Sequence, residues 1–127
     1  MFNWLRRREE ACRAGEMPEV GKNSDLECLL RQDLVVLFKH SPACPVSWAA
    51  HSQVNRFRLK HPEVPVHIVH VIRDRNTSMK IAEMTGVRHE SPQIVILRNG
   101  VVAGSASHGH ITEARLTAML AGTPVQH

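Results

Sequence analysis

A short apolar run followed by a cysteine between two prolines constrains this chain most. The run Leu34-Val35-Val36-Leu37-Phe38 is unbroken and rich in β-branched residues, which is typical of a strand buried on both faces. The next residues, His40-Ser41-Pro42-Ala43-Cys44-Pro45-Val46-Ser47, predict a turn into a helix, with Pro45 at the first helical position. The pattern therefore predicts that a buried strand delivers Cys44 to the start of a helix.

This predicted position favours chemistry at the Cys44 sulfur. The first turn of a helix has free N–H groups and the positive end of the helix dipole, and both favour the nucleophilic thiolate over the thiol. Ser47 stands where a Cys-x-x-Cys redox motif has its second cysteine, so this is a one-cysteine variant. The alternative is that Cys44 is a small buried residue without chemistry, as many lone cysteines are.

Length and composition fit one globular domain. The chain has 127 residues, of which 43% are hydrophobic and 22% charged, and this is enough to form a core without disulfides or metal. Its three cysteines, Cys12, Cys28 and Cys44, are too widely spaced for a zinc knuckle, and they predict a reducing compartment. We expect no metal.

Charge and hydropathy exclude several classes of partner. The N-terminus lacks the pattern of a signal peptide, and no run approaches the roughly 20 apolar residues of a membrane helix. The net charge of +4 comes from scattered basic residues, and aromatic residues are few, which argues against a nucleic-acid binder. We expect a cytoplasmic protein, monomeric, without nucleic-acid or membrane partners.

Along the chain, the pattern predicts an N-terminal extension over 1–23 that is poorly ordered, a domain over 24–122 and a tail over 123–127. A capping box with Ser24 as N-cap and Glu27 opens a helix through about Gln32. The helix after Cys44 ends near His61, because Pro62 cannot follow inside it.

The second half predicts a strand, a helix, a hairpin and a last helix. The strand covers Val64 to Ile72, and its His67 and His70 point to opposite faces, so they are not a paired metal site. The other signals are Asn76 or Thr77 as a helix cap with Gly86 closing that helix, Asn99-Gly100 as a type I′ hairpin turn, and Thr112 as the last cap.

This order of elements resembles the thioredoxin fold, an α/β fold with a central mixed four-stranded sheet flanked by helices. Three blocks narrow the resemblance: residues 39–47 around Cys44, residues 85–93 ending in Ser91-Pro92-Gln93, and Ala106-Ser107-His108 with Ile111-Thr112. Together they resemble the monothiol bacilliredoxins of the bacillithiol system, the YtxJ-type family. The resemblance runs from about Ser24 to Gly122.

The resemblance implies roles for individual residues. Cys44 would be the attacking thiol, and Pro92 a cis-proline that turns the backbone of Ser91 toward an extended substrate. Ser47 cannot resolve a disulfide, but it can hydrogen-bond the Cys44 thiolate and lower its pKa. His40 and Lys39 would add positive charge or carry the proton of the leaving group, with a structural histidine as the alternative for His40.

The remaining site residues belong to substrate binding. We expect Pro45, His89 and His108 to contact the substrate, with Glu90 near the same face of the protein. A histidine or Arg88 could bind the carboxylates of bacillithiol. The implied activity is thiol exchange that removes bacillithiol from protein mixed disulfides, with bacillithiol as co-substrate thiol. The partners would be bacillithiolated proteins, together with the reductant that regenerates Cys44, either bacillithiol itself or a disulfide reductase.

Two other functions remain open from the sequence. A one-cysteine glutaredoxin carries a [2Fe-2S] cluster with a Cys-Gly-Phe-Ser motif, and Cys44-Pro45-Val46-Ser47 has the same frame, although Pro45 would hinder cluster docking. A binding module with an inert Cys44 on the same scaffold is the second alternative. A role for Cys12 or Cys28 as a distant resolving cysteine also remains open.

Overall fold

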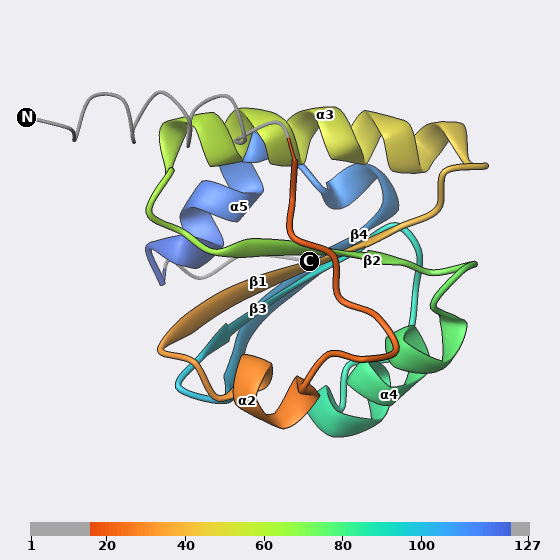
Figure 1. The fold of residues 1–127 in the computed structure, drawn as a ribbon. Coiled ribbons are helices and arrows are strands. Elements are labelled where there is room, and N and C mark those ends of the chain that lie inside the picture. The colour runs from red at the N-terminus through yellow and green to blue at the C-terminus, as the bar shows by residue number, and fades with distance from the viewer. Residues whose placement is uncertain (1–15, 123–127) are drawn as a thin grey trace, which may run out of the picture.

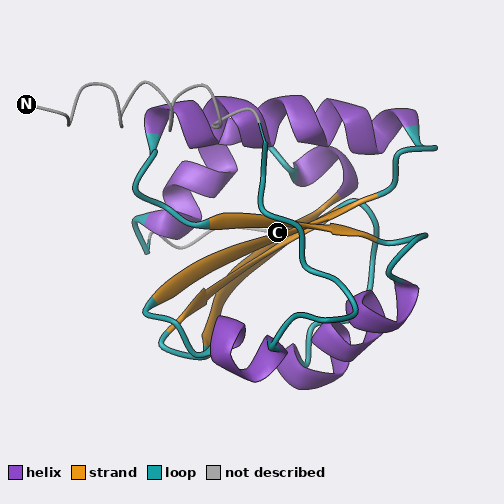
Figure 2. Cartoon of the chain, in the orientation of Figure 1, coloured by secondary structure: helices purple, strands orange, loops and turns teal. Residues whose placement is uncertain are grey.

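The computed structural model describes residues 16–122. Helices and strands alternate along the first two thirds of this range, as Figures 1 and 2 show. In chain order the elements are α2 (Leu26–Leu30), β1 (Leu34–His40), α3 (Pro45–Lys60), β2 (Val66–His70), α4 (Arg75–Thr85), β3 (Gln93–Arg98), β4 (Val101–Ser107), the 3-10 helix η1 (His108–His110) and α5 (Glu113–Leu120).

The four strands form one mixed sheet in the order β2-β1-β3-β4. Strand β1 pairs with β2 in parallel and with β3 in antiparallel orientation, and β3 pairs with β4 across the hairpin. Helices α3 and α5 cover one face of this sheet, and α2 and α4 cover the other (Figure 1). The prediction of a four-stranded mixed sheet flanked by helices is confirmed.

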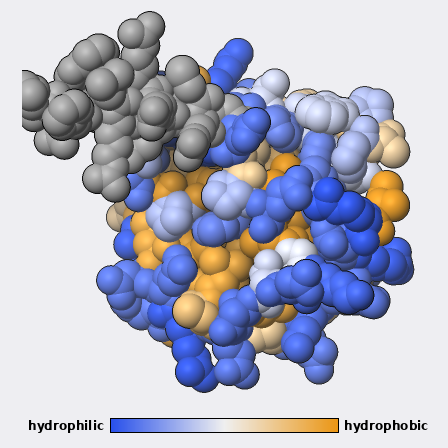
Figure 3. Space-filling model, in the orientation of Figure 1, coloured by the Kyte–Doolittle hydropathy of each residue, from blue (hydrophilic) through white to orange (hydrophobic). Residues whose placement is uncertain are grey.

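A hydrophobic core fills the space on each side of the sheet. On the α3 side, Val36 and Phe38 of β1 pack against Val54 and Phe57 of α3. On the other side, Val35 and Leu37 pack against α2 and α4. Because β1 is buried on both faces, it has the unbroken apolar sequence that marked it as a strand. On the face seen in Figure 3, apolar surface gathers at the level of the sheet, with hydrophilic side chains around it.

Most of the local signals are found where they were predicted. Asn99 and Gly100 both have positive φ, 51° and 81°, and they join β3 to β4. Gly86 ends α4 in the left-handed conformation, and the Thr112 side chain caps α5 by accepting from the Arg115 N–H. Strand β2 is shorter than predicted, from Val66 to His70.

Two predicted helix caps are wrong. The Ser24 hydroxyl accepts a hydrogen bond from the Gly21 N–H at 3.0 Å, so Asp25 caps α2 instead, through the Cys28 N–H. Helix α4 begins at Arg75, before Asn76 and Thr77, and its N-cap is Asp74. The Asp74 carboxylate bonds with Arg73 and makes no side-chain capping hydrogen bond.

The domain also begins earlier than Ser24. Met17 and Val20 are buried, and the Val20 N–H and Pro18 C=O bond with Ile68 of β2, so this segment extends the outer edge of the sheet. The first part of the expected N-terminal extension, with Cys12, lies outside the described residues, as does the expected tail over 123–127.

Candidate active site

One edge of the sheet collects the residues that the sequence analysis selected. Parallel pairing places the carboxyl ends of β1 and β2 together, with His40 opposite His70. Strand β3 begins at this edge, where Gln93 pairs with both Lys39 of β1 and Ser107 at the end of β4. The loop that carries Cys44, the Ser91-Pro92 turn and His108 therefore all leave the sheet at this edge, on the right of Figure 1.

Cys44 is the N-cap residue of α3, as predicted. Its backbone is extended, with φ −111° and ψ 121°, and its carbonyl accepts from the N–H groups of Ser47 and Trp48. Pro45 is exposed at the first helical position, where it lacks the N–H that would otherwise be free. Cys44 is half-buried, and the helix dipole favours a negative charge at this end of a helix. Cys44 is thus both accessible and suitably placed for thiolate chemistry.

The Ser47 hydroxyl is committed to partners other than the sulfur. Ser47 is fully buried, and its Oγ accepts from the Ser41 N–H at 2.9 Å and lies 2.7 Å from Nδ1 of His40. Within residues 16–122, the structure has no hydrogen bond between this hydroxyl and Cys44. Ser47 therefore holds the loop before Cys44, whereas the sequence analysis expected it to bond the thiolate.

His40 is a buried, neutral side chain. It is 1% exposed, and its ring lies among those of Phe38, Trp48, His51 and His70. Burial, with smaller contributions from His51 and His70, lowers the pKa of His40 to about 4. At neutral pH His40 therefore adds no positive charge at the site, in contrast to the expectation from the sequence.

Trp48 is a site residue that sequence reasoning missed. The residue is 50% exposed, in the first turn of α3. Its Nε1–H donates to the Pro42 carbonyl at 2.7 Å, and its ring packs edge-on against His40 at 4.6 Å between centroids. The signal was available: Trp48 lies four residues after Cys44, in the first turn of the helix that the sequence predicts.

Lys39 faces the opposite side of the sheet from His40, because successive residues of a strand alternate. It is fully buried, and its ammonium donates to the Ser78 carbonyl of α4 at 2.9 Å and lies 3.1 Å from His89 Nδ1. Burial lowers the pKa of Lys39 to about 8. Burial, and then the charges of Lys39 and Arg75, lower the pKa of His89. Lys39 and His89 thus form a polar contact with each other under α4, on the face of the sheet opposite His40, and their roles toward the substrate stay predictions.

The Ser91-Pro92 peptide bond is cis. Pro92 is buried, and its carbonyl accepts from the His108 N–H at 3.0 Å, which ties the start of β3 to the end of β4. Strand pairing begins only at Gln93, so the Ser91 backbone lies outside the ladder, and its buried Oγ has no partner within residues 16–122. His108 is exposed beside this turn. Of the predicted binding residues, Ser91, Pro92 and His108 lie together at the site edge.

Arg88 and Glu90 lie in the segment before this turn. The Arg88 carbonyl accepts from the Gln93 side-chain amide at 2.8 Å, and its side chain is exposed. Glu90 is half-buried, and its charge raises the pKa of His89 against the larger lowering effects.

Cys28 lies at the far end of the domain from Cys44. It is exposed on α2, and the carbonyl of Leu30 in the same helix lies against Gly100 of the β3–β4 hairpin, at the opposite edge of the sheet. Both cysteines of the described range are free thiols. In that range, no group of three or more His, Cys, Asp or Glu side chains could hold a metal ion.

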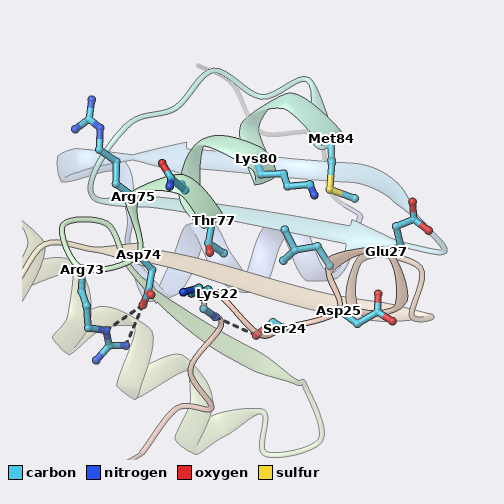
Figure 4. A pocket seen from close by; sticks show the side chains of 13 residues that line it. Lys22, Ser24, Asp25, Glu27, Arg73, Asp74, Arg75, Thr77, Lys80 and Met84 are labelled. Atoms are coloured by element: carbon cyan, nitrogen blue, oxygen red, sulfur yellow. Dashed lines mark hydrogen bonds and ion pairs between the residues drawn. The ribbon is translucent and has the colours of Figure 1, made fainter.

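A groove on the surface of the described structure lies apart from Cys44. It has a volume of about 770 Å³ between residues 21–27 and the first turns of α4, and Figure 4 shows its mixed charges. Lys22 and Lys80 lie within it, with Asp25 and Glu27 at one side. None of the residues from His40 to Trp48 lines it, so we assign it no part in the chemistry of Cys44.

Comparison with known proteins places this geometry in a family. Residues 20–116 match the family model of the monothiol bacilliredoxin BrxC. The chain belongs to the monothiol bacilliredoxin family. The matched range contains Cys44, Ser47 and the Ser91-Pro92 turn, and the resemblance noted from the sequence is confirmed.

Solved structures agree on the fold of this bacilliredoxin. A candidate oxidoreductase with a thioredoxin fold is 29% identical, with a TM-score of 0.76, over 84% of this chain and 95% of that one. Thioredoxins from Trypanosoma brucei brucei and Fasciola hepatica are 16% and 20% identical, with TM-scores of 0.67 and 0.66. The two matches cover 86% and 85% of this chain, and 91% and 100% of the respective thioredoxin chains. The bacilliredoxin has a thioredoxin fold, and family and fold together indicate a thiol oxidoreductase.

None of the helices within residues 16–122 combines the length and apolar character needed to cross a membrane.

Proposed function

We propose that this bacilliredoxin removes bacillithiol from protein mixed disulfides, with Cys44 as the nucleophile. The observation that carries the proposal is the position of Cys44: a half-buried thiol at the N-cap of α3, with a serine in place of a second cysteine. A thiol so placed can attack a disulfide, but it has no neighbour in its own motif to expel the product. One-step transfer onto Cys44 is the chemistry that follows.

The first step exchanges one disulfide for another. The Cys44 thiolate attacks the bacillithiol sulfur of the mixed disulfide, and the bond between that sulfur and the protein cysteine breaks. The target protein leaves as a thiolate, which takes a proton from solvent, and a Cys44–bacillithiol disulfide remains. No net oxidation or reduction occurs in this step.

Among the thiols of residues 16–122, none can carry out the second step, so we assign it to an external thiol. Ser47 has no sulfur, and Cys28 lies at the opposite edge of the sheet, so neither can displace bacillithiol from Cys44. A second bacillithiol would attack the bacillithiol sulfur of the intermediate, release the Cys44 thiolate and leave as bacillithiol disulfide. A dithiol reductase would instead restore the Cys44 thiol, release bacillithiol as a free thiol and end as its own disulfide.

The Ser91-Pro92 turn supplies a place for the target protein. Because the Ser91 backbone lies outside the strand ladder, its N–H and C=O are positioned to pair with an extended segment of the target. The exposed His108 adds a polar group at the same edge, suited to the carboxylates and hydroxyls of bacillithiol.

The test is transfer of bacillithiol onto Cys44. A bacillithiolated substrate protein is mixed with the chain, and intact-mass and peptide mass spectrometry follow the added mass. We expect the mass on Cys44, with release of the substrate thiol. Cys44→Ser is the negative control, and Cys28→Ser is the matched cysteine control that should behave as wild type.

Two results would overturn the proposal. One is transfer in wild type no greater than in Cys44→Ser. The other is a coloured protein whose visible absorption requires Cys44, which would favour the iron–sulfur carrier.

A further inference from the structure

The loop from Ser41 to Cys44 is held by two side chains of the helix that follows it. The Ser47 hydroxyl accepts from the Ser41 N–H at 2.9 Å, and the Trp48 indole donates to the Pro42 carbonyl at 2.7 Å. The Cys44 N–H closes the loop on the Ser41 carbonyl at 3.1 Å. The direction in which the loop presents Cys44 therefore depends on Ser47 and Trp48.

His40 contacts both of these side chains. Its Nδ1 lies 2.7 Å from the Ser47 Oγ, and its ring meets the Trp48 ring edge-on, with an interplanar angle of 82°. Its own carbonyl accepts from the Val71 N–H at 3.0 Å, which fixes the end of β1 to the loop after β2. His40 thus joins the rigid sheet to the two side chains that hold the loop.

The hydrogen bonds of Ser47 assign the tautomer of His40. The Ser47 Oγ already accepts from the Ser41 N–H, and its hydroxyl hydrogen needs an acceptor. Nδ1 of His40 is the acceptor within reach, which places the ring hydrogen on Nε2. The Nε2 atom is buried without a partner within residues 16–122, so this tautomer leaves one unsatisfied group, the Nε2–H. The opposite tautomer would leave two, the Ser47 hydroxyl hydrogen and the Nε2 lone pair, at a greater cost in free energy.

The surroundings of His40 keep it neutral. His51 of α3 and His70 of β2 lie at 5.1 Å and 6.1 Å between ring centroids, and a second positive charge there is unfavourable. Glu19 bonds with His70 at 3.2 Å and Asn55 with His51 at 3.2 Å, while Arg58 disfavours a charge on His51. A protonated Nδ1 could not accept from Ser47, so the neutral ring is the form that supports the loop.

We propose that His40 is a positioning residue: as the neutral Nε2–H tautomer it orients Ser47 and Trp48, and through them it fixes the loop that presents Cys44. Its polar partner is Ser47, and within residues 16–122 it has no hydrogen bond to the Cys44 sulfur, which distinguishes it from the catalytic group that the sequence suggested. The proposal rests on Cys44 being the reactive thiol, but it is independent of which disulfide Cys44 attacks.

The experiment compares His40→Phe, which keeps an aromatic ring but loses the acceptor, with His40→Asn, whose amide can replace Nδ1. The full chain carries Cys12→Ser and Cys28→Ser so that Cys44 alone reacts. His67→Phe is the matched control, because His67 is a strand histidine that faces the other side of the sheet. The probe is 2,2′-dithiodipyridine, a small disulfide unrelated to bacillithiol.

We expect the reaction of Cys44 with the probe to slow about five- to tenfold in His40→Phe, the loss of roughly one hydrogen bond. Exchange of the Ser41 amide hydrogen should rise in parallel, and the Trp48 indole resonance should shift. His40→Asn should recover most of the rate, and His67→Phe should leave it unchanged. Histidine ¹⁵N spectra of the wild type should show His40 as the Nε2–H tautomer.

Three results would overturn the proposal: a His40→Phe rate equal to wild type, an unrescued His40→Asn, or the Nδ1–H tautomer in the wild-type spectrum. The tautomer measurement needs no variant, so it decides even if His40→Phe does not fold. Failure of bacillithiol transfer with a normal, His40-dependent probe reaction would refute the proposed function alone.

Discussion

Replacing Ser47 with alanine should destabilise the domain far more than the loss of one oxygen atom suggests. The substitution leaves two groups without their partner, the His40 Nδ1 at 2.7 Å and the Ser41 N–H at 2.9 Å. An unsatisfied buried polar group costs about 1–3 kcal/mol, and His40 is fully buried while Ser41 is half-buried. We therefore expect the free energy of unfolding to fall by about 2–4 kcal/mol in Ser47→Ala.

Urea denaturation followed by circular dichroism measures this loss. The midpoint should move to lower urea with an unchanged m-value, since the surface exposed on unfolding stays the same. Ser52→Ala is the control: Ser52 is exposed on the same helix, and its change should stay within about 0.5 kcal/mol. A loss below about 0.5 kcal/mol in Ser47→Ala would refute the reasoning that Ser47 bonds support the loop.

Three further predictions concern other groups. The folded-state pKa of His40, about 4, lies below its ordinary value of 6.5, so the unfolded chain takes up the proton first as pH falls. The free energy of unfolding, measured with urea, should therefore fall between pH 6.5 and 4, by roughly 3 kcal/mol more in wild type than in His40→Phe. An equal dependence of this free energy on pH in the two proteins would contradict the prediction. The pKa of Lys39 is also lowered on folding, to about 8 from 10.5, so the unfolded chain holds this proton up to a higher pH than the folded chain does. The free energy of unfolding of wild type should therefore rise by roughly 3 kcal/mol from pH 8 to 10.5, relative to that of Lys39→Met. A flat difference curve would show that Lys39 titrates normally. Cys28→Ser should leave the alkylation rate of Cys44 by iodoacetamide unchanged, because α2 lies at the opposite edge of the sheet; a slower rate would indicate a link between the two cysteines.

The fold could be predicted from the sequence because the patterns that indicate each helix, strand and turn are local. The apolar run of β1, the Asn99-Gly100 turn and the caps at Gly86 and Thr112 each depend on neighbouring residues, and each is found as predicted. The Ser24 cap was wrong for a local reason too, since its hydroxyl turns back to Gly21 while Asp25 takes its place.

The partners of the site side chains could not be predicted in the same way. His40 and Lys39 are adjacent in sequence, yet one lies among the rings under α3 and the other contacts Ser78 under α4. Strand alternation predicts that they diverge, but which helix covers each face is decided by the whole fold. The same holds for Ser47. Its hydroxyl bonds with His40, the last residue of β1, because the packing of α3 on the sheet brings the two side chains together.

The most direct test of the central claim, that Cys44 carries the exchange, is a single-turnover reaction. The chain is mixed with an excess of bacillithiolated substrate protein without any other thiol, and the released substrate thiol is counted against the amount of chain. The account predicts one equivalent of substrate thiol for each Cys44, one equivalent of bacillithiol on that residue, and none in Cys44→Ser. Release that continues past one equivalent without added thiol, or that persists in Cys44→Ser, would contradict it.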